Sequence, residues 1–289
     1  MIDSNMQSAV LGRTGLCVKR LGYGAAHRKP QSKENAKLIH QTALDLGINF
    51  IDTADDYGNS EELIGEFLSH RRSEYFLATK CGGSDKGHIW TKQNCILTFE
   101  NSLKRLKTDV IDIMQLHNPS VDECVSGKLV EALQEMKQTG KVHWIGVSTN
   151  LPDLTTYLEW DVFDVFQIPY SPLERLHEDW IRKVASNGVG VIIRGGAALG
   201  EPGIGKGEKL NWDNFNKSNL DDLRGFGESR TSFVLRLTLT HPDAHTLIVG
   251  TTNLKHLKEN VESVQRGPLD EDIYLEAMKR LEKLGERPV

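Results

Sequence analysis

Short runs of apolar, often β-branched residues recur along the chain and predict eight strands. Between most of them, apolar residues return every three or four positions, which is the spacing of a helix that buries one face. Several runs are apolar almost throughout, as expected for parallel strands covered on both faces. The predicted strands span residues 20–24, 48–51, 75–79, 110–116, 142–147, 165–168, 189–194 and 246–249.

The predicted helices have recognisable starts and ends. Ser32 is a typical N-cap residue, and Asn59 followed by Glu62 has the spacing of a capping box at a helix start. Glycines that follow a helical stretch and precede a strand suit the left-handed conformation of a helix end; they are Gly47, Gly140 and Gly188. Further helices are expected over residues 91–106, 127–138, 177–186, 253–265 and 269–284.

Eight strands alternating with helices predict a single (β/α)8 TIM barrel over residues 1–289. A doubly wound sheet is the alternative. A short β-hairpin is expected before the first barrel strand, over about 8–19, with its turn at Arg13–Gly15. A long loop is expected over about 195–225, because that stretch is rich in Gly, Asn and Lys and has no clear period. A loop of this length inside a compact domain is usually functional.

Composition narrows the class of protein. The 289 residues include 35 basic and 40 acidic ones, a net charge of −5, which disfavours general nucleic-acid binding. No apolar stretch is long enough to span a membrane, and no secretion signal is evident. The four cysteines and ten histidines lack the spacing of a metal site, so no metal is expected. We expect a cytoplasmic protein, monomeric by default.

Four polar residues follow three consecutive predicted strands at their carboxyl ends, where a barrel of this type carries its chemistry. They are Asp52 with Tyr57, then Lys80, then His117. Each alone has an ordinary structural explanation, but together they form a chemical set. A tyrosine releases its proton only near pH 10, and a neighbouring cation such as Lys80 favours the phenolate. Asp52 would hold Lys80, and His117 would position a carbonyl oxygen against the tyrosine hydroxyl.

The run Asp52-Thr-Ala-Asp-Asp-Tyr-Gly-Asn-Ser-Glu61, with Lys80, His117 and the segments 146–150 and 250–260, resembles the aldo-keto reductase superfamily. The resemblance covers nearly the whole chain. It implies a barrel enzyme that reduces aldehydes or ketones, or oxidises alcohols, with a nicotinamide cofactor and no metal. It also implies that Tyr57 is the general acid, that Asp52 and Lys80 tune it, and that His117 orients the carbonyl.

The same resemblance implies a set of cofactor-binding residues. The nicotinamide end would contact Ser148, Asn150 and Gln167, and the adenosine end would contact Gly250, Thr251, Lys255, His256, Glu259 and Asn260. Arg194 stands where many relatives carry an aromatic segment that stacks on the nicotinamide, so we expect it to contact the cofactor, with a substrate carboxylate as the alternative. Tyr23 and Trp90 are tentative walls of the substrate pocket.

The function expected is NADPH-dependent reduction of a small aldehyde or ketone. Cations near the 2′-phosphate position are few, so NAD(H) is the alternative cofactor, and an NAD(P)-dependent sugar or alcohol dehydrogenase is the alternative activity. A cofactor-binding regulatory subunit is a third and weaker hypothesis. The segment Gly200–Gly207 nearly matches a phosphate-binding P-loop, but Gly207 replaces the required Ser or Thr. We expect it instead to cover the cofactor pyrophosphate with its backbone amides and Lys206.

Overall fold

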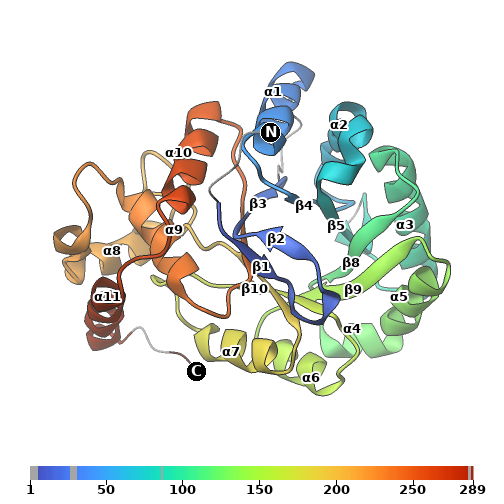
Figure 1. Cartoon of the computed structure of the whole chain (residues 1–289). Helices are drawn as coiled ribbons and strands as arrows, with labels where there is room; N and C mark the ends of the chain where they lie inside the picture. Colours follow the sequence, from blue (N-terminus) through green and yellow to red (C-terminus); the bar gives the residue numbers. More distant parts are fainter. Residues whose placement is uncertain (1–5, 27–30, 86, 286–287, 289) are drawn as a thin grey trace.

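The strands of the computed structural model, which describes residues 6–26, 31–85, 87–285 and 288, close into a parallel barrel (Figure 1). Their order around the barrel is β10-β11-β12-β3-β4-β5-β8-β9, so neighbours in sequence are neighbours in space. The predicted (β/α)8 barrel is confirmed and the doubly wound sheet is not. The bounds are β3 Leu21–Gly24, β4 Phe50–Asp52, β5 Phe76–Cys81, β8 Ile111–His117, β9 Val142–Ser148, β10 Val165–Pro169, β11 Gly190–Arg194 and β12 Thr246–Val249.

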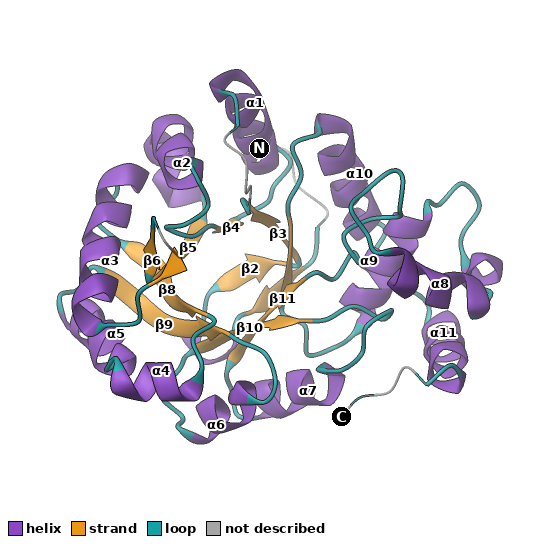
Figure 2. Ribbon diagram, turned by 180° about the vertical axis from the view of Figure 1, so that it is seen from behind, coloured by secondary structure: helices purple, strands orange, loops and turns teal. Residues whose placement is uncertain are grey.

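Helices ring the barrel, as both views show (Figures 1 and 2). Their bounds are α1 Lys33–Asp45, α2 Ser60–Leu68, α3 Lys92–Leu106, α4 Val121–Ser126, α5 Leu129–Gln138, α6 Asp153–Glu159, α7 Glu178–Ser186, α8 Lys209–Lys217, α9 Arg230–Thr240, α10 Leu254–Gln265 and α11 Glu271–Lys283. The helices α4, α6, α8 and α9 were not predicted. Among the described residues, no helix is long and apolar enough to cross a membrane.

The helix starts confirm one predicted cap and correct another. The Ser32 side chain accepts the backbone N–H of Asn35 at the start of α1, as its position predicts. Asn59 precedes α2 but its side chain makes no capping bond. Its amide instead exchanges hydrogen bonds with the backbone of Gln31, at 3.3 Å each way. A tertiary partner therefore takes the group that the local pattern assigned to the helix end.

The predicted amino-terminal hairpin closes one end of the barrel. Its strands are β1 Ser8–Val10 and β2 Cys17–Lys19, which pair in antiparallel fashion, with a short 3-10 turn between them. In Figure 1 the hairpin lies across the centre of the ring. Leu11 and Val18 are fully buried and belong to one cluster with inward-facing barrel residues. The hairpin therefore seals the amino end with apolar side chains, and the opposite end is left for polar groups.

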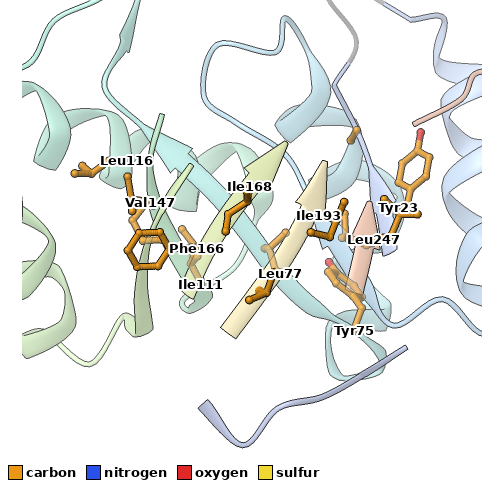
Figure 3. Close-up of a cluster of buried hydrophobic side chains, with 14 of the residues drawn as sticks. Tyr23, Tyr75, Leu77, Ile111, Leu116, Val147, Phe166, Ile168, Ile193 and Leu247 are labelled. Atoms are coloured by element: carbon orange, nitrogen blue, oxygen red, sulfur yellow. The ribbon is translucent and has the colours of Figure 1, made fainter. Parts of the chain in front are cut away.

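Side chains on each strand alternate between the barrel interior and the helix layer. Outward-facing residues such as Leu77, Phe166 and Ile193 are drawn in Figure 3 and pack in one cluster with helix residues. The inward-facing residues form a separate apolar cluster with the hairpin; they are Phe50, Ala78, Ile113, Val165 and Ile192. Burial of both sets favours this register, because a shift by one residue would exchange them.

The expected long loop is partly wrong, because it contains α8 and a 3-10 turn at Leu220–Leu223. The helix α8 contains three Asn residues and one Asp, so its own helix propensity is low. Two aromatic residues three positions apart, Trp212 and Phe215, are buried on one face and pack in a cluster with α9 and α11. Figure 2 shows this group of helices beside the barrel ring. Tertiary packing, more than local pattern, therefore makes this helix.

The Gly200–Gly207 segment folds on itself. The amide of Lys206 donates to the Leu199 carbonyl at 2.8 Å, and that of Gly207 donates to the Gly200 carbonyl at 3.0 Å. These amides are therefore already used within the turn, and the expectation that they cover a pyrophosphate is wrong for this conformation. The Lys206 side chain is exposed.

Candidate active site

A polar layer lies directly above the apolar layer of the barrel interior. Moving two residues along each strand keeps a side chain on the same face and brings it toward the carboxyl end. This step leads from the five inward-facing apolar residues to five polar ones, which are Asp52, Lys80, Gln115, Gln167 and Arg194. The barrel geometry therefore collects side chains from five strands at one end.

Asp52 and Lys80 form the centre of this layer. Their side chains are 2% and 0% exposed, and Nζ of Lys80 lies 2.6 Å from Oδ2 of Asp52. Lys80 also donates to the Thr53 carbonyl at 2.8 Å. Burial by itself lowers the pKa of Lys80, but Asp52 and Tyr57 together outweigh burial and the net direction is upward. Lys80 therefore stays charged although it is buried.

Two glutamine amides complete the environment of Asp52. Nε2 of Gln115 and Nε2 of Gln167 donate to Oδ1 of Asp52 at 3.0 and 2.8 Å. Each carboxylate oxygen of Asp52 is thus matched by a donor, as a buried charge requires. Gln115 was not predicted, although it lies two residues before His117 on the same inward face of the strand.

Tyr57 lies between this network and the rim of the barrel. Nζ of Lys80 is 5.1 Å from the centre of the Tyr57 ring, and the Tyr57 hydroxyl lies 3.4 Å from Nε2 of His117. Burial raises the pKa of Tyr57, and this effect exceeds the lowering by Lys80. The sequence predicted that Lys80 lowers the pKa of Tyr57, but in this structure the net shift of that pKa is upward. The phenol keeps its proton at neutral pH, as a proton donor must.

His117 connects Tyr57 to a second group of side chains on the rim. Nδ1 of His117 lies 3.1 Å from Oδ1 of Asp56, and Nε2 of His88 lies 3.5 Å from Oδ2 of the same carboxylate. The His88 ring packs edge-on against His117 and stacks on Trp90, with centroid distances of 5.0 and 4.8 Å. Asp56 and His88 were not predicted, because their loops meet only in the fold.

The last two residues of the Asp52–Glu61 run support the site from behind. The Ser60 hydroxyl lies 2.8 Å from that of Thr53, and both are buried. Glu61 is 2% exposed; it accepts from Thr79 at 2.6 Å and pairs with Arg105 of α3 at 2.6 Å. These contacts fix α2 against β5 and α3. Ser60 and Glu61 therefore hold the loop that carries Tyr57.

The geometry can now be compared with that of known proteins. Residues 20–283 match the model of the aldo/keto reductase family. This chain belongs to the aldo/keto reductase family. It is 30% identical to L-galactose dehydrogenase of Arabidopsis thaliana over 285 residues, covering 90% of this chain and 89% of that protein. It is 27% identical to the uncharacterized oxidoreductase YqkF of Bacillus subtilis (strain 168), covering 92% of this chain and 94% of that protein.

A solved structure gives the same result. The aldo-keto reductase AKR11C1 from Bacillus halodurans, in its holo form, superposes with a TM-score of 0.84 at 28% identity. The alignment covers 95% of this chain and 96% of that chain. The chain is thus an NAD(P)-dependent oxidoreductase of the aldo-keto reductase type, and it acts on a small molecule.

Several residues predicted to bind the reductase cofactor lie at the same carboxyl end of the barrel. Ser148 ends β9 and is buried, and Nη2 of Arg194 donates to Oδ1 of Asn150 at 2.6 Å. Asn150 in turn donates to Asn118 at 2.8 Å. Gln167 was expected at the nicotinamide, but its amide is bound to Asp52. In this structure Gln167 therefore supports the charged pair.

Arg194 retains an unused donor. Its Nε is buried and has no hydrogen-bond partner among the described residues. Burial lowers the pKa of Arg194. A buried donor without a partner is costly, and a bound ligand is one common reason for it. This N–H group is suited to donate a hydrogen bond to a polar cofactor or substrate at the carboxyl end of the barrel.

The residues predicted for the adenosine end lie where β12 meets α10. A Cβ on Gly250 would come within 2.3 Å of the Gly24 carbonyl oxygen, so glycine allows two strand ends to meet there. Thr251 follows, and the predicted helix residues lie on the first turns of α10; they are Lys255, His256, Glu259 and Asn260. Asn253 caps the helix by accepting the Lys255 amide at 2.9 Å. A capped helix start favours anionic groups such as phosphates.

Of the two tentative pocket walls, Tyr23 is wrong. Its side chain is 0% exposed, and its ring packs edge-on against His40 of α1 at 5.5 Å. Tyr23 faces the helix layer because it occupies an outward position of β3; the inward neighbours are Gly22 and Gly24. Trp90 does lie at the rim, stacked on His88, where it remains a candidate wall.

Proposed function

We propose that this enzyme reduces a small aldehyde or ketone to the alcohol with NADPH, and that Tyr57 donates the proton. The observation that carries the proposal is the position of the Tyr57 hydroxyl, which lies 3.4 Å from Nε2 of His117 while Lys80 lies beneath the ring. A carbonyl oxygen at the rim can approach both groups together.

When bound, the nicotinamide cofactor supplies the hydride that adds to the carbonyl carbon. The protein's own residues manage the proton. The Tyr57 O–H bond breaks as its proton passes to the carbonyl oxygen, and the charge left on the phenolate is stabilised by Lys80. Asp52 keeps Lys80 charged and in place, because it is 2.6 Å from the ammonium nitrogen and is itself held by two glutamine amides. His117 orients the carbonyl through Nε2.

The cofactor would be held by residues on both sides of the opening. Ser148, Asn150 and Arg194 would bind the nicotinamide end, and the start of α10 would bind the adenosine phosphates. Lys255 is exposed and forms a surface ion pair with Glu259 at 3.7 Å, an interaction weak enough for a 2′-phosphate to replace. His256 follows Lys255 in the chain. A cation at this position supports NADPH as the preferred cofactor over NADH.

The test is cofactor oxidation with a panel of small aldehydes, measured for the parent, Tyr57→Phe and Tyr23→Phe. Loss of a general acid typically lowers the rate by about 10²–10⁴-fold, and we expect Tyr57→Phe to fall in that range. Tyr23→Phe is the matched control, because it removes a buried hydroxyl from the helix side of the barrel. Equal rates for the parent and Tyr57→Phe would refute the proton-donor role.

A second activity is favoured by one comparison. The 30% identity to a protein named L-galactose dehydrogenase supports an NAD(P)-dependent sugar or alcohol dehydrogenase that runs in the oxidative direction. The same residues would act in reverse: the phenolate form of Tyr57, stabilised by Lys80, would accept the alcohol proton while an oxidised nicotinamide cofactor would accept the hydride. Dissociation constants for NADP and NAD, measured on the same protein and on Lys255→Met, distinguish the cofactors. A clear preference for NAD, unchanged in Lys255→Met, would support the dehydrogenase.

A further inference from the structure

A group of three metal-binding side chains lies on the rim, outside the Asp52–Lys80 network. Asp56, His88 and His117 each offer one ligand atom, and these atoms lie within 4.8 Å of one another. The three residues come from the loop after β4, the short strand β7 (Gly87–His88) and the end of β8. Only the fold brings these residues together, so their spacing in the sequence did not predict a metal site.

The distances are close to those of a tetrahedral metal site. With zinc–nitrogen and zinc–oxygen bonds of about 2.0–2.1 Å, ligand atoms in a tetrahedron lie roughly 3.4 Å apart. The Asp56 carboxylate faces both rings, with Oδ1 at 3.1 Å from Nδ1 of His117 and Oδ2 at 3.5 Å from Nε2 of His88. One ligand atom from each of the three residues lies within 4.8 Å of the other two, so a bound ion needs to draw them together only slightly. Two imidazoles and one carboxylate are a common ligand set for zinc, and a three-ligand site leaves one coordination position open.

The surroundings also favour a cation. Nδ1 of His117 is buried and has no hydrogen-bond partner of acceptable geometry among the described residues, although a carboxylate oxygen lies beside it. Oδ1 of Asp55 is likewise buried and has no partner among those residues. A second carboxylate next to the three ligands adds negative potential. A divalent cation would therefore use an orphaned nitrogen and offset two neighbouring acidic groups.

The rings are also held in place before any ion arrives. His88 stacks on Trp90 with an interplanar angle of 3°, and its ring meets that of His117 edge-on. The side chains of Asp56, His88 and His117 are 29%, 30% and 16% exposed, so the group is accessible to ions from solution. An accessible and pre-arranged ligand set needs little reorganisation on binding.

We propose that Asp56, His88 and His117 form a regulatory site for a divalent transition-metal ion of the zinc class, and that the bound ion inhibits the reduction. The ion takes Nδ1 of His117 and so pins this ring to Asp56 and His88. The pinned ring can no longer adjust Nε2 to the carbonyl oxygen beside the Tyr57 hydroxyl, and the reduction slows. Magnesium does not substitute, because it prefers oxygen ligands.

The first experiment measures binding without substrate or cofactor, so its result does not depend on the proposed reaction. The full-length enzyme is treated with EDTA, dialysed and titrated with ZnCl₂ by calorimetry. We expect one zinc ion per chain in the parent and a loss of affinity of about 100-fold in His88→Gln, which lacks one of three ligands. His143→Gln is the matched control, because His143 faces Asp112 at 3.4 Å but belongs to no three-ligand group among the described residues. It should bind zinc as the parent does.

The second experiment measures activity during the same zinc titration. We expect inhibition that follows site occupancy, that EDTA reverses, and that requires about 100-fold more zinc in His88→Gln. Cobalt in place of zinc gives the parent the visible absorption of a tetrahedral site, a readout that does not depend on any variant folding. The proposal is wrong if the parent binds no zinc at this site, if His88→Gln binds zinc as tightly as the parent, or if the fully occupied enzyme reduces carbonyls at an unchanged rate.

Discussion

The two layers of the barrel interior lie only two residues apart on the same strands, but their chemistry is opposite. On β5 the step leads from Ala78 to Lys80, and on β8 it leads from Ile113 to Gln115. The lower layer is sealed by the hairpin and is apolar throughout. The upper layer is buried too, and yet it contains a full charge pair. Burial alone therefore does not determine which residues a barrel interior accepts.

The difference lies in how completely the polar groups are paired. An unpaired buried charge is strongly destabilising, whereas a buried pair with satisfied hydrogen bonds is tolerated. Asp52 has three donors, from Lys80, Gln115 and Gln167. The apolar layer stabilises the barrel by packing, and the polar layer holds the rim groups in position. The predictions below test these separate roles.

The largest expected effect comes from removing the buried cation. Lys80→Met leaves Asp52 charged without its ammonium partner, and we expect a loss of about 3–5 kcal/mol in the free energy of unfolding. Adding Asp52→Asn removes the stranded charge but keeps an oxygen for both glutamine amides. Urea denaturation should therefore show the double variant to be more stable than Lys80→Met alone. A double variant that is less stable would contradict the pairing argument.

Next in size is a cavity in the apolar layer. Ile113→Ala removes buried methyl and methylene groups, and we expect a loss of about 3 kcal/mol, with about 1 kcal/mol for the smaller change Ile113→Val. The measurement is again urea denaturation. If Ile113→Ala costs no more than Ile113→Val, the lower layer is not packed as described.

A smaller effect is expected from one glutamine. Gln115→Leu removes one donor to Asp52, and it also removes a carboxamide oxygen that is buried without a partner among the described residues. The two changes oppose each other, so we expect a net loss of about 1 kcal/mol. Gln115→Glu brings a second carboxyl group to Asp52 and should cost more. Thermal unfolding of both variants at neutral pH measures the two losses. A larger loss in Gln115→Leu than in Gln115→Glu would show that Gln115 is not a donor to Asp52.

The smallest effect is a pH dependence at the amino end of the barrel. Nδ1 of His245 accepts the Val191 amide at 2.9 Å, and the pKa of His245 is lowered by burial first and by Arg20 second, with Asp243 opposing. A lowered folded-state pKa means that the unfolded chain binds the proton more readily. This stabilisation is present above the unfolded value of about 6.5 and is lost as the pH falls below it.

Between pH 7 and pH 6, this one group accounts for a loss of at most about 0.7 kcal/mol. In His245→Gln that part of the acid sensitivity should disappear. Urea midpoints of the parent and the variant at both pH values provide the measurement. An unchanged pH dependence in the variant would assign the effect to other histidines.

Much of the fold followed from local pattern. The apolar runs gave the positions of all eight barrel strands to within about two residues, because buried parallel strands carry a strong apolar signal. The missed helices had weaker signals. The helix α4 begins with a capping box between Ser120 and Glu123, which the sequence does contain, but it is only six residues long. The helix α8 depends on two buried aromatic residues, because its Asn and Asp residues disfavour a helix.

The residues of the candidate site also divide into those that the sequence predicts and those that it does not. Asp52, Tyr57, Lys80 and His117 could be predicted because they follow consecutive strands and match a known motif. Gln115 could have been found, and Tyr23 rejected, from strict alternation along β8 and β3. Asp56 and His88 could not be linked from the sequence, since their pairing depends on how two loops fold over the rim.

The central claim is that both layers contribute to stability, whereas only the polar layer serves catalysis. The direct test is kcat/KM for aldehyde reduction in Lys80→Met and Ile113→Ala, measured side by side at a temperature where both are folded. The account predicts a loss of about 100-fold or more in Lys80→Met, because the phenolate loses its cation, and a change of less than about threefold in Ile113→Ala. Equal losses in the two variants would contradict it.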